Sequence, residues 1–292
     1  MEQNTKNTAL RAVDEDFNRL PPTVYRPLLS AKHLRTYFPV TSGFWQRVTD
    51  HVRAVDGVSI DVHPGEIVAL VGESGCGKST LGFSLLGLTP PTSGTLELLG
   101  NTIDLTDPAA WKRYRRDFQI VFQDPHTSLN PRLTVFELLT EPMRVHNIVP
   151  PSELRAAAAN LLKQVGLPED ALNRFPHAFS GGQRQRLCIA RALSLRPKLI
   201  VCDEVVSALD VSVQAQIVNL LLELKKTHGL ALLFITHDLS LVHAIADRVL
   251  VMNAGKIVEE GAAAELFAHP KDDYTRTLLA AVPRMERRTV VR

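Results

Sequence analysis

The chain has 292 residues, of which 45% are apolar and 22% charged, and its formal net charge is +2. This composition fits a protein that buries a large core as one extended domain, and so small a net charge argues against nucleic acid as the main partner. The apolar stretches, such as residues 230–235, are far shorter than the roughly 20 residues that cross a membrane, which excludes a chain that is itself a pore.

Residues 1–27 are polar and end in a proline-rich stretch, and we expect a mobile or loosely docked leader there. They lack the apolar segment of a secretory signal, which favours a cytoplasmic location. The cysteines Cys76, Cys188 and Cys202 are odd in number and lie in a loop, a predicted helix and a predicted buried strand, so a disulfide framework is not expected.

Residues 28–38 and 52–62 alternate apolar and polar side chains. The alternation predicts two antiparallel strands, joined by a loop that contains Gly43 and Trp45, in a sheet covered on one side. The chain therefore continues from its leader into antiparallel β structure.

Four later runs are almost wholly apolar, and most are separated by helical patterns, which is typical of strands buried on both faces of a parallel sheet. These runs are residues 67–71, 120–122, 199–202 and 230–235. Residues 79–88 follow the first run as a predicted helix, and residues 211–228 follow the third, with Leu and Ile at intervals of three and four.

A polar stretch between these runs carries two further predicted helices, residues 134–147 and 152–165, bounded by prolines. We interpret residues of about 130–195 as a helical subdomain inserted into the core. The predicted fold class is therefore α/β, with a mostly parallel sheet, an antiparallel β subdomain and an inserted helical subdomain.

A glycine-rich loop follows the first apolar run and opens a predicted helix. Its residues are Gly72, Glu73, Ser74, Gly75, Cys76, Gly77, Lys78, Ser79 and Thr80. The glycines permit a tight turn whose backbone N–H groups face phosphate, and the helix N-terminus adds roughly half a positive charge. Lys78 is placed to bridge the outer phosphates of ATP, and the Ser79 hydroxyl to bind Mg²⁺. A chance glycine-rich turn is the competing interpretation, and the coincidence of strand, loop and helix argues against it.

Two carboxylates end the third apolar run, at the same edge of the sheet as the phosphate loop. Asp203 is expected to hold Mg²⁺, through water. Glu204 would orient or deprotonate the attacking water, a role worth roughly 10²–10⁴-fold in rate. In isolation such a pair is commonly a solvated strand end.

His237 and Gln123 also follow apolar runs, so both are expected at this edge of the sheet. A histidine there is usually only a polar strand-end residue, but its place in the chain order supports a contact to the terminal phosphate. Gln123 is placed to sense Mg²⁺ and water while leading into the helical insert.

A Ser-Gly-Gly-Gln tract, Ser180, Gly181, Gly182 and Gln183, lies between the phosphate loop and the acidic strand. The motifs and their order resemble the ATPase subunits of ABC transporters over roughly residues 28–284, with a tail at 285–292. The residues that carry the resemblance are 72–80, Gln123, 180–183, Asp203, Glu204, 207–210 and His237. The resemblance implies ATP hydrolysis with Mg²⁺ bound near Ser79, Gln123 and Asp203.

The resemblance also implies that two cassettes pair head to tail, each nucleotide lying between one subunit's phosphate loop and the other's signature tract. Ser180, Gly182 and Gln183 would then contact the partner's nucleotide, and Asp210 would couple the two sites. A different chain is favoured as the second cassette over a homodimer. Two permease subunits, docked near residues 123–141, would make the only membrane contact, and a solute-binding protein would act indirectly. The chain would be peripheral, on the cytoplasmic face of the inner membrane, with no nucleic acid partner.

Finer features resemble the importer branch for peptides, nickel and opines. They are residues 122–131, 175–186, 211–216 and 269–279. They predict an importer ATPase for short peptides or related small solutes. The alternatives are nickel or opine cargo, a soluble ABC factor outside transport, and a weakly hydrolysing regulatory cassette. The last is motivated by Val205, which stands where the family generally has proline, while Glu204 and His237 argue against it.

An aromatic ring near the end of the first strand usually stacks on adenine in this family. Alignment on the following Pro39 favours Phe38, with Tyr37 as the runner-up, and either could instead be strand core. For Cys76 we expect that, if its thiol is exposed, ATP slows its alkylation.

Overall fold

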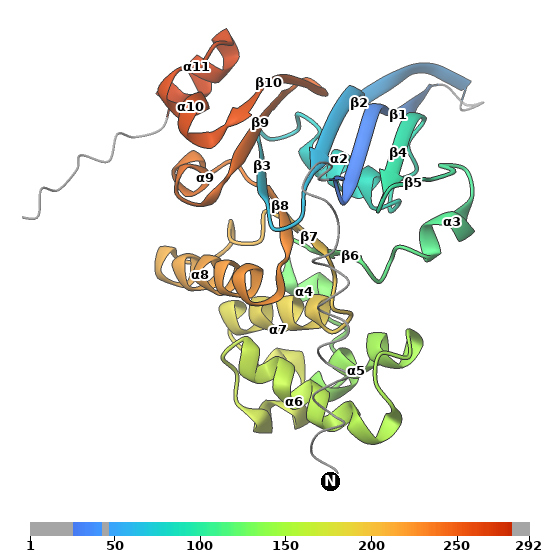
Figure 1. Ribbon diagram of the computed structural model, residues 1–292, viewed down its shortest axis with the longest axis vertical. Helices are drawn as coiled ribbons and strands as arrows, with labels where there is room; N and C mark the ends of the chain where they lie inside the picture. The colour runs from blue at the N-terminus through green and yellow to red at the C-terminus, as the bar shows by residue number, and fades with distance from the viewer. Residues whose placement is uncertain (1–25, 43–46, 282–292) are drawn as a thin grey trace, which may run out of the picture.

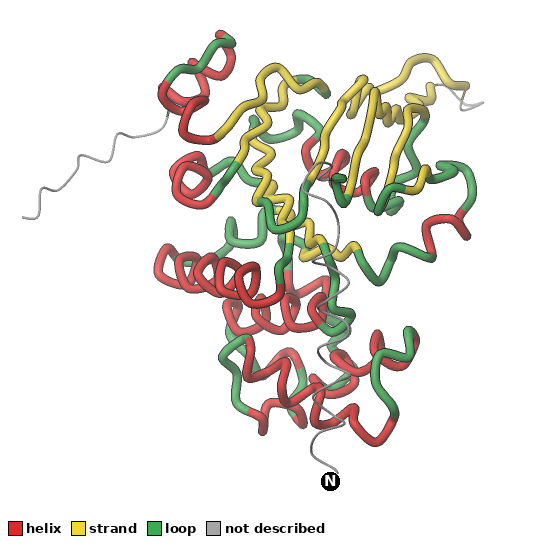
Figure 2. The backbone as a smooth tube through the Cα atoms, in the orientation of Figure 1, coloured by secondary structure: helices red, strands yellow, loops and turns green. Residues whose placement is uncertain are grey.

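The computed structural model describes residues 26–42 and 47–281, which form two β-sheets and a set of flanking helices (Figures 1 and 2). The predicted leader lies outside the described residues except for residues 26 and 27, as do Gly43, Trp45 and the predicted tail at 285–292. Figure 1 shows the smaller sheet at one end of the molecule and the helices α5, α6 and α7 at the other.

The smaller sheet is antiparallel, with the strand order β2-β1-β4-β5. Its strands are β1 Leu29–Ser42, β2 Arg47–Val62, β4 Ser93–Leu98 and β5 Asn101–Thr102. The two antiparallel strands predicted from alternation are confirmed as β1 and β2, and both extend further toward the loop that joins them. The strands β4 and β5 are additions that their short, partly exposed sequences do not signal.

The larger sheet has six strands in the order β10-β9-β3-β8-β7-β6, parallel except for β10. Its strands are β3 Ile67–Val71, β6 Phe118–Val121, β7 Leu199–Asp203, β8 Ala231–Ile235, β9 Arg248–Asn253 and β10 Lys256–Ala262. The four predicted buried strands are confirmed as β3, β6, β7 and β8. The mostly parallel sheet of the prediction is also confirmed.

Alternate side chains of the central strands separate two layers of core. One face, which includes Ile200, Cys202 and Phe234, packs with the helices α7 Gly181–Leu193 and α8 Val211–His228. The other face, which includes Val201 and Leu233, packs with α2 Lys78–Leu85 and the antiparallel sheet. The helices α2 and α7 therefore cover opposite faces of the same sheet.

The remaining helices include short connectors, the two 11-residue helices α5 and α6, and the helices α9, α10 and α11, which contact β3, β9 or β10. They are α3 Pro108–Lys112, α4 Pro125–Ser128, α5 Val135–Val145, η1 Pro151–Glu153, α6 Leu154–Gln164, η2 Glu169–Asn173, η3 Pro176–Ala178, α9 Leu239–Ile245, α10 Ala263–Ala268 and α11 Asp273–Ala280. The predicted helices at 134–147, 152–165 and 211–228 are confirmed as α5, α6 and α8. The predicted helix at 79–88 ends earlier, because Gly87 takes a left-handed φ of 64° with its backbone directly against the Trp111 ring.

Local sequence explains where the main helices begin and end. Thr134 and Glu137 form a capping box at the start of α5, and α8 ends at Gly229 in the left-handed conformation. Helices α5, α6 and α7, which lie within residues 130–195, share one apolar core with α8 and one face of the sheet. The helical layer is thus continuous with the sheet rather than separately packed.

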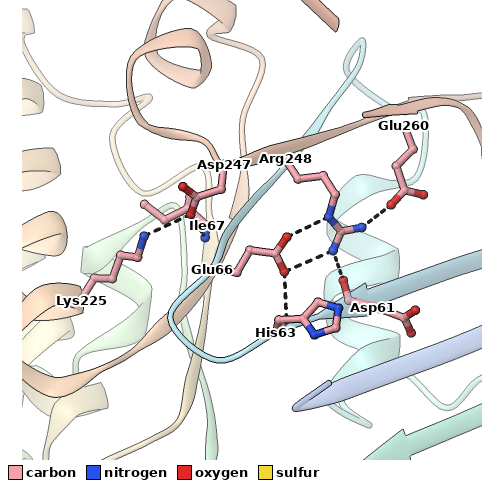
Figure 3. A network of polar contacts seen from close by, with 8 residues as sticks. All are labelled: Asp61, His63, Glu66, Ile67, Lys225, Asp247, Arg248 and Glu260. Atoms are coloured by element: carbon pink, nitrogen blue, oxygen red, sulfur yellow. Dashed lines mark hydrogen bonds and ion pairs between the residues drawn. The ribbon is translucent and has the colours of Figure 1, made fainter. Parts of the chain in front are cut away.

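A network of polar contacts joins the two sheets near the N-terminal end of β3 (Figure 3). The Arg248 guanidinium donates to the Glu66 carboxylate at 2.8 Å and also contacts Glu260 and the Asp61 carbonyl. The Asp247 carboxylate accepts from Lys225 at 3.1 Å. These contacts join β2, β9, β10 and α8, and so fix the antiparallel sheet against the core.

Candidate nucleotide-binding site

The phosphate loop lies between the end of β3 and the start of α2, as predicted from sequence. Gly77, the N-cap of α2, has a φ of 108°, and a Cβ there would lie 2.0 Å from the Ala54 carbonyl oxygen. A Cβ on Gly72 would lie 2.2 Å from the Met252 carbonyl oxygen. Only glycine fits such close approaches, so the loop is built around its two end glycines.

The Lys78 side chain is folded into the loop and is only 4% exposed. Its amine donates to the carbonyl oxygens of Gly72 and Glu73, both at 2.8 Å. Cys76 lines the same interior, with its sulfur 3.8 Å from the amine, and its side chain is 8% exposed. The condition for the alkylation hypothesis, an exposed thiol at Cys76, is therefore not met. Gly75, Glu73 and Ser74 are exposed on the outer side of the loop.

Ser79 and Asp203 bring a hydroxyl and a carboxylate together at the carboxyl edge of the sheet. The Ser79 hydroxyl donates to Asp203 Oδ1 at 2.8 Å. Asp203 is 6% exposed, and burial raises the pKa of its carboxyl, with the charge of Glu204 acting in the same direction. The hydrogen bond from Ser79 and the charge of Lys78 oppose this shift. This all-oxygen donor pair suits Mg²⁺, which takes few protein ligands and keeps several waters.

Glu204 and His237 lie side by side on neighbouring strand ends. Glu204 has a left-handed φ of 49°, uncommon for a residue other than glycine, and its N–H donates to the Ile235 carbonyl at 3.0 Å. His237 Nδ1 lies 3.6 Å from Glu204 Oε1. His237 is exposed and Glu204 half-buried, so both side chains are accessible from solvent.

Gln123 reaches the same group through Ser207. Its amide donates to the Ser207 hydroxyl at 3.3 Å, and that hydroxyl donates to the Glu204 carbonyl at 2.9 Å. The structure therefore links the three residues predicted as catalytic, Gln123, Glu204 and His237, across β6, β7 and β8. Val205, next to Glu204, is buried in the core behind it.

The signature tract forms the first turn of α7. Ser180 is the N-cap and forms a capping box with Gln183, whose side chain accepts from the Ser180 N–H at 3.1 Å. Gly182 packs against α8, where a Cβ would lie 2.4 Å from the Val213 side chain. Ser180, Gly181 and Gln183 are exposed. Asp210, also exposed, is the N-cap of α8, and Thr80 lies in the first turn of α2.

The signature tract and the phosphate loop are not brought together within one chain. The loop opens α2, and the signature opens α7, on the opposite face of the six-stranded sheet. Figure 1 shows α7 among the lower helices and α2 beside the antiparallel sheet. A single chain thus presents the two predicted half-sites on separate surfaces.

The two candidate aromatic residues are neighbours in β1, next to a register irregularity between Thr36 and Tyr37. The Tyr37 hydroxyl donates to Asp56 at 2.5 Å, which commits its ring to the β1–β2 surface. The Phe38 ring is 42% exposed, and the Thr36 hydroxyl, two residues earlier, contacts Ser84 of α2 at 2.8 Å. Of the two rings, Phe38 is therefore the exposed one, in the part of β1 that lies close to α2.

The sequence patterns did not predict one contact of the phosphate loop. The Glu73 N–H donates to the hydroxyl oxygen of Tyr274 in α11 at 3.0 Å. The two residues are 201 positions apart, and no local pattern links them. A spacing motif cannot reveal a contact that depends on how α11 packs.

Comparison with known proteins identifies the family. The family model described as "ABC transporter" matches residues 55–207. A glutathione import ATP-binding protein from Pectobacterium atrosepticum is 50% identical over 278 residues, covering 95% of this chain and 44% of that protein. The corresponding protein from Shigella flexneri is 51% identical over 257 residues, covering 88% of this chain and 41% of that protein. The chain thus spans less than half the length of these relatives.

Solved structures agree with this assignment. A part of the ABC transporter complex cbiONQ from Clostridium perfringens has a TM-score of 0.71 at 29% identity, covering 89% of this chain and 97% of that one. A dimeric ATP-binding cassette in a post-hydrolysis state with ADP and phosphate has a TM-score of 0.70 at 28% identity, covering 80% and 98%. Within residues 26–42 and 47–281, the helices are all too short or too polar to cross a membrane. The predicted fold class is confirmed, and the chain belongs to the ABC transporter family.

Proposed function

We propose that this chain is the ATP-binding and ATP-hydrolysing subunit of an ABC importer for short peptides or related small solutes. The proposal rests mainly on a cluster of polar side chains at the carboxyl edge of the parallel sheet. In this cluster Ser79 bonds to Asp203, and Gln123 lies with Glu204 and His237. The identity to glutathione import proteins over 95% of the chain supports a peptide-like cargo, with nickel or opines as alternatives in the same branch.

Nucleotide binding would begin at Lys78. Its amine now donates to two neutral carbonyls at 2.8 Å, and the phosphates of ATP would offer charged acceptors, which form stronger hydrogen bonds. Ser79 and Asp203 would hold Mg²⁺, which neutralises charge on the phosphates. Asp203 must be ionised for this role. The positive charge of Lys78 favours that form.

Hydrolysis would depend on Glu204, Gln123 and His237. Glu204 would orient or deprotonate the attacking water, and its left-handed backbone turns it away from the direction of β7. Gln123 would respond to Mg²⁺ and water, and its link through Ser207 supports coupled movement with Glu204. The exposed His237 would contact the terminal phosphate. The chemistry is phosphoryl transfer to water, achieved by positioning and charge stabilisation.

A second cassette would complete the site. Because α2 and α7 cover opposite faces of the sheet, Ser180, Gly182 and Gln183 lie on a different surface from the chain's own phosphate loop. The exposed N-terminus of α7 is suited to an anion, and a partner's nucleotide would provide one. Asp210 would lie at the same interface. The importer branch favours a different chain as the partner.

Permease subunits would dock on a groove between β6, α4, α5 and α7. This groove has a volume of about 300 Å³, and its lining is mainly apolar but includes two arginines. Its lining includes Ile120, Phe122, Leu129, Pro142, Arg115 and Arg191. It overlaps residues 123–141 and the proposed helical subdomain at about 130–195, within a cassette that we place at residues 28–284. Contact through two permeases would hold the chain at the cytoplasmic face of the inner membrane.

Uptake in a strain that lacks this chain tests the function. We expect the wild-type chain to restore ATP-dependent uptake of labelled glutathione or dipeptides, and Lys78→Ala to abolish both uptake and tight ATP binding. Labelled nickel and an opine in parallel cultures identify the alternative cargoes. Wild-type ATP turnover with no change in the uptake of any solute would instead favour a cassette that acts outside transport.

A further inference from the structure

The C-terminal helix α11 contacts the phosphate loop through one hydroxyl. Glu73 donates its backbone N–H to the Tyr274 oxygen at 3.0 Å. We propose that Tyr274 is a positioning residue for the nucleotide, because its hydroxyl sets the orientation of the first peptide group of the phosphate loop. This inference rests on the proposed ATP-binding function and deepens it.

The peptide group between Gly72 and Glu73 connects Tyr274 to Lys78. Its N–H donates to Tyr274, and its carbonyl, that of Gly72, accepts from the Lys78 amine at 2.8 Å. Because a peptide group is planar, the orientation of its N–H also fixes that of its carbonyl. Tyr274 therefore acts on the position of the Lys78 amine through one rigid group.

The next carbonyl strengthens the link. The Glu73 carbonyl accepts from the Lys78 amine at 2.8 Å and from the Cys76 N–H at 3.3 Å. The side chain of Glu73 is exposed. Packing of that side chain does not hold this part of the loop, so its order depends on the backbone contacts, of which Tyr274 supplies one from outside the loop.

Tyr274 is itself held firmly by the turn before α11. The Glu259 carboxylate of β10 accepts from the N–H groups of Lys271 and Asp272, at 2.9 and 3.0 Å. The Asp272 side chain caps α11 by accepting from the Tyr274 N–H at 2.8 Å. The Tyr274 ring packs on the core cluster that contains Val71, the last residue of β3. Contacts with strand β10 and with the end of β3 thus fix the position of the Tyr274 hydroxyl.

The hydroxyl keeps one chemical form in the working range. Burial raises the pKa of Tyr274, so the group is neutral at physiological pH and its oxygen is available to accept from Glu73. Figure 1 shows α10 and α11 beside β10, away from the lower helices that carry the signature. The contact therefore links the C-terminal part of the chain to its own phosphate loop.

Tyr274→Phe removes the hydroxyl and keeps the ring. Loss of one hydrogen bond of this kind is expected to raise the Kd for ATP, and the KM of the assembled ATPase, about 3–10-fold. We expect kcat to stay within about twofold, because bound phosphates then order the loop, and the melting temperature to change little. In hydrogen exchange of the nucleotide-free protein, the amides of residues 70–78 should exchange about 3–10-fold faster.

Two further variants make the test specific. Tyr114→Phe makes the same chemical change in a ring that packs edge-on against Phe118, and we expect wild-type binding and exchange. Glu259→Gln weakens the anchor of the turn before α11, and we expect the same direction of change as Tyr274→Phe with a smaller size.

The outcomes separate this inference from the function on which it rests. Failure of the wild-type chain to bind ATP would overturn both. If wild-type binds, Lys78→Ala does not, and Tyr274→Phe matches wild-type in Kd and in exchange at residues 70–78, the inference alone is wrong. A general rise in exchange with a large fall in melting temperature would also overturn it, since the hydroxyl would then have only a structural role.

Discussion

Gly182→Ala tests whether the signature tract needs glycine for packing, for nucleotide contact or for both. A Cβ at this position would lie 2.4 Å from Val213 Cγ1, far closer than real contacts allow. Overpacking of this kind destabilises a protein by about 1–3 kcal/mol, whereas alanine in place of glycine in a helix adds up to about 1 kcal/mol of stability. We therefore expect a net loss of about 1 kcal/mol in the free energy of unfolding, with a range of about 0–2 kcal/mol.

The neighbouring glycine provides the matched control. A Cβ on Gly181 would lie 3.8 Å from Leu209, an ordinary contact, so Gly181→Ala should be neutral or slightly stabilising. Urea denaturation of the nucleotide-free protein measures both variants. Adding Val213→Ala to Gly182→Ala should recover part of the loss, and the double-mutant cycle should show a coupling of about 1–2 kcal/mol.

Activity of the double variant then separates the two roles. If Gly182 also faces the partner's nucleotide, ATP turnover of the assembled complex stays low after stability has been recovered. Equal stability of Gly181→Ala and Gly182→Ala, or no coupling to Val213, would refute the packing argument. Wild-type turnover of the stable double variant would remove Gly182 from the nucleotide site.

Three further predictions follow from single contacts. The pKa of Asp203 is raised in the folded state, so the protein loses stability as the pH rises above the pKa of this carboxyl in the unfolded chain. Without Mg²⁺, Asp203→Asn should therefore have a higher melting temperature than wild-type at pH 7.5, and the difference should shrink toward pH 4. A lower melting temperature for the variant at pH 7.5 would contradict this. Arg248→Met should lower the free energy of unfolding, measured by urea denaturation, by about 1–3 kcal/mol. Lys271→Ala breaks only an exposed ion pair and should lower it by less than about 0.5 kcal/mol. Equal losses would rule out a special role for the network in Figure 3. If the Phe38 ring stacks on adenine, Phe38→Ala should raise the Kd for ATP about 5–150-fold, while Tyr37→Phe should change this Kd less than twofold. A larger effect of Tyr37→Phe than of Phe38→Ala would instead make Tyr37 the residue that contacts adenine.

Local patterns predicted most of the sheet and the site-bearing turns. The runs at β3, β7 and β8 are apolar on both faces, and each ends in residues that chemistry needs, so their place at one edge followed from parallel topology. The predicted helices at 134–147 and 211–228 agree closely with α5 and α8, whose limits are set in the structure by a capping box and by a terminal glycine. The order of the motifs along the chain indicates the family by itself.

Contacts between distant segments were outside the reach of such patterns. Strand β9 was not predicted, although it is largely buried beside β3. The bond from Glu73 to Tyr274 depends on the packing of α11, and the burial of Cys76 depends on how the loop folds over its own lysine. Glu204 likewise combines a left-handed backbone with a bond to Ile235 of the neighbouring strand, a pairing that its local sequence does not indicate.

Turnover by Glu204→Gln in the assembled complex tests the central claim most directly. Glutamine keeps the size of the side chain next to His237 and removes its ability to accept a proton. We predict an ATP affinity within about threefold of wild-type and a turnover lower by roughly a hundredfold or more. Wild-type turnover in this variant would contradict the account, because the carboxylate on which the proposed hydrolysis depends would then have no part in it.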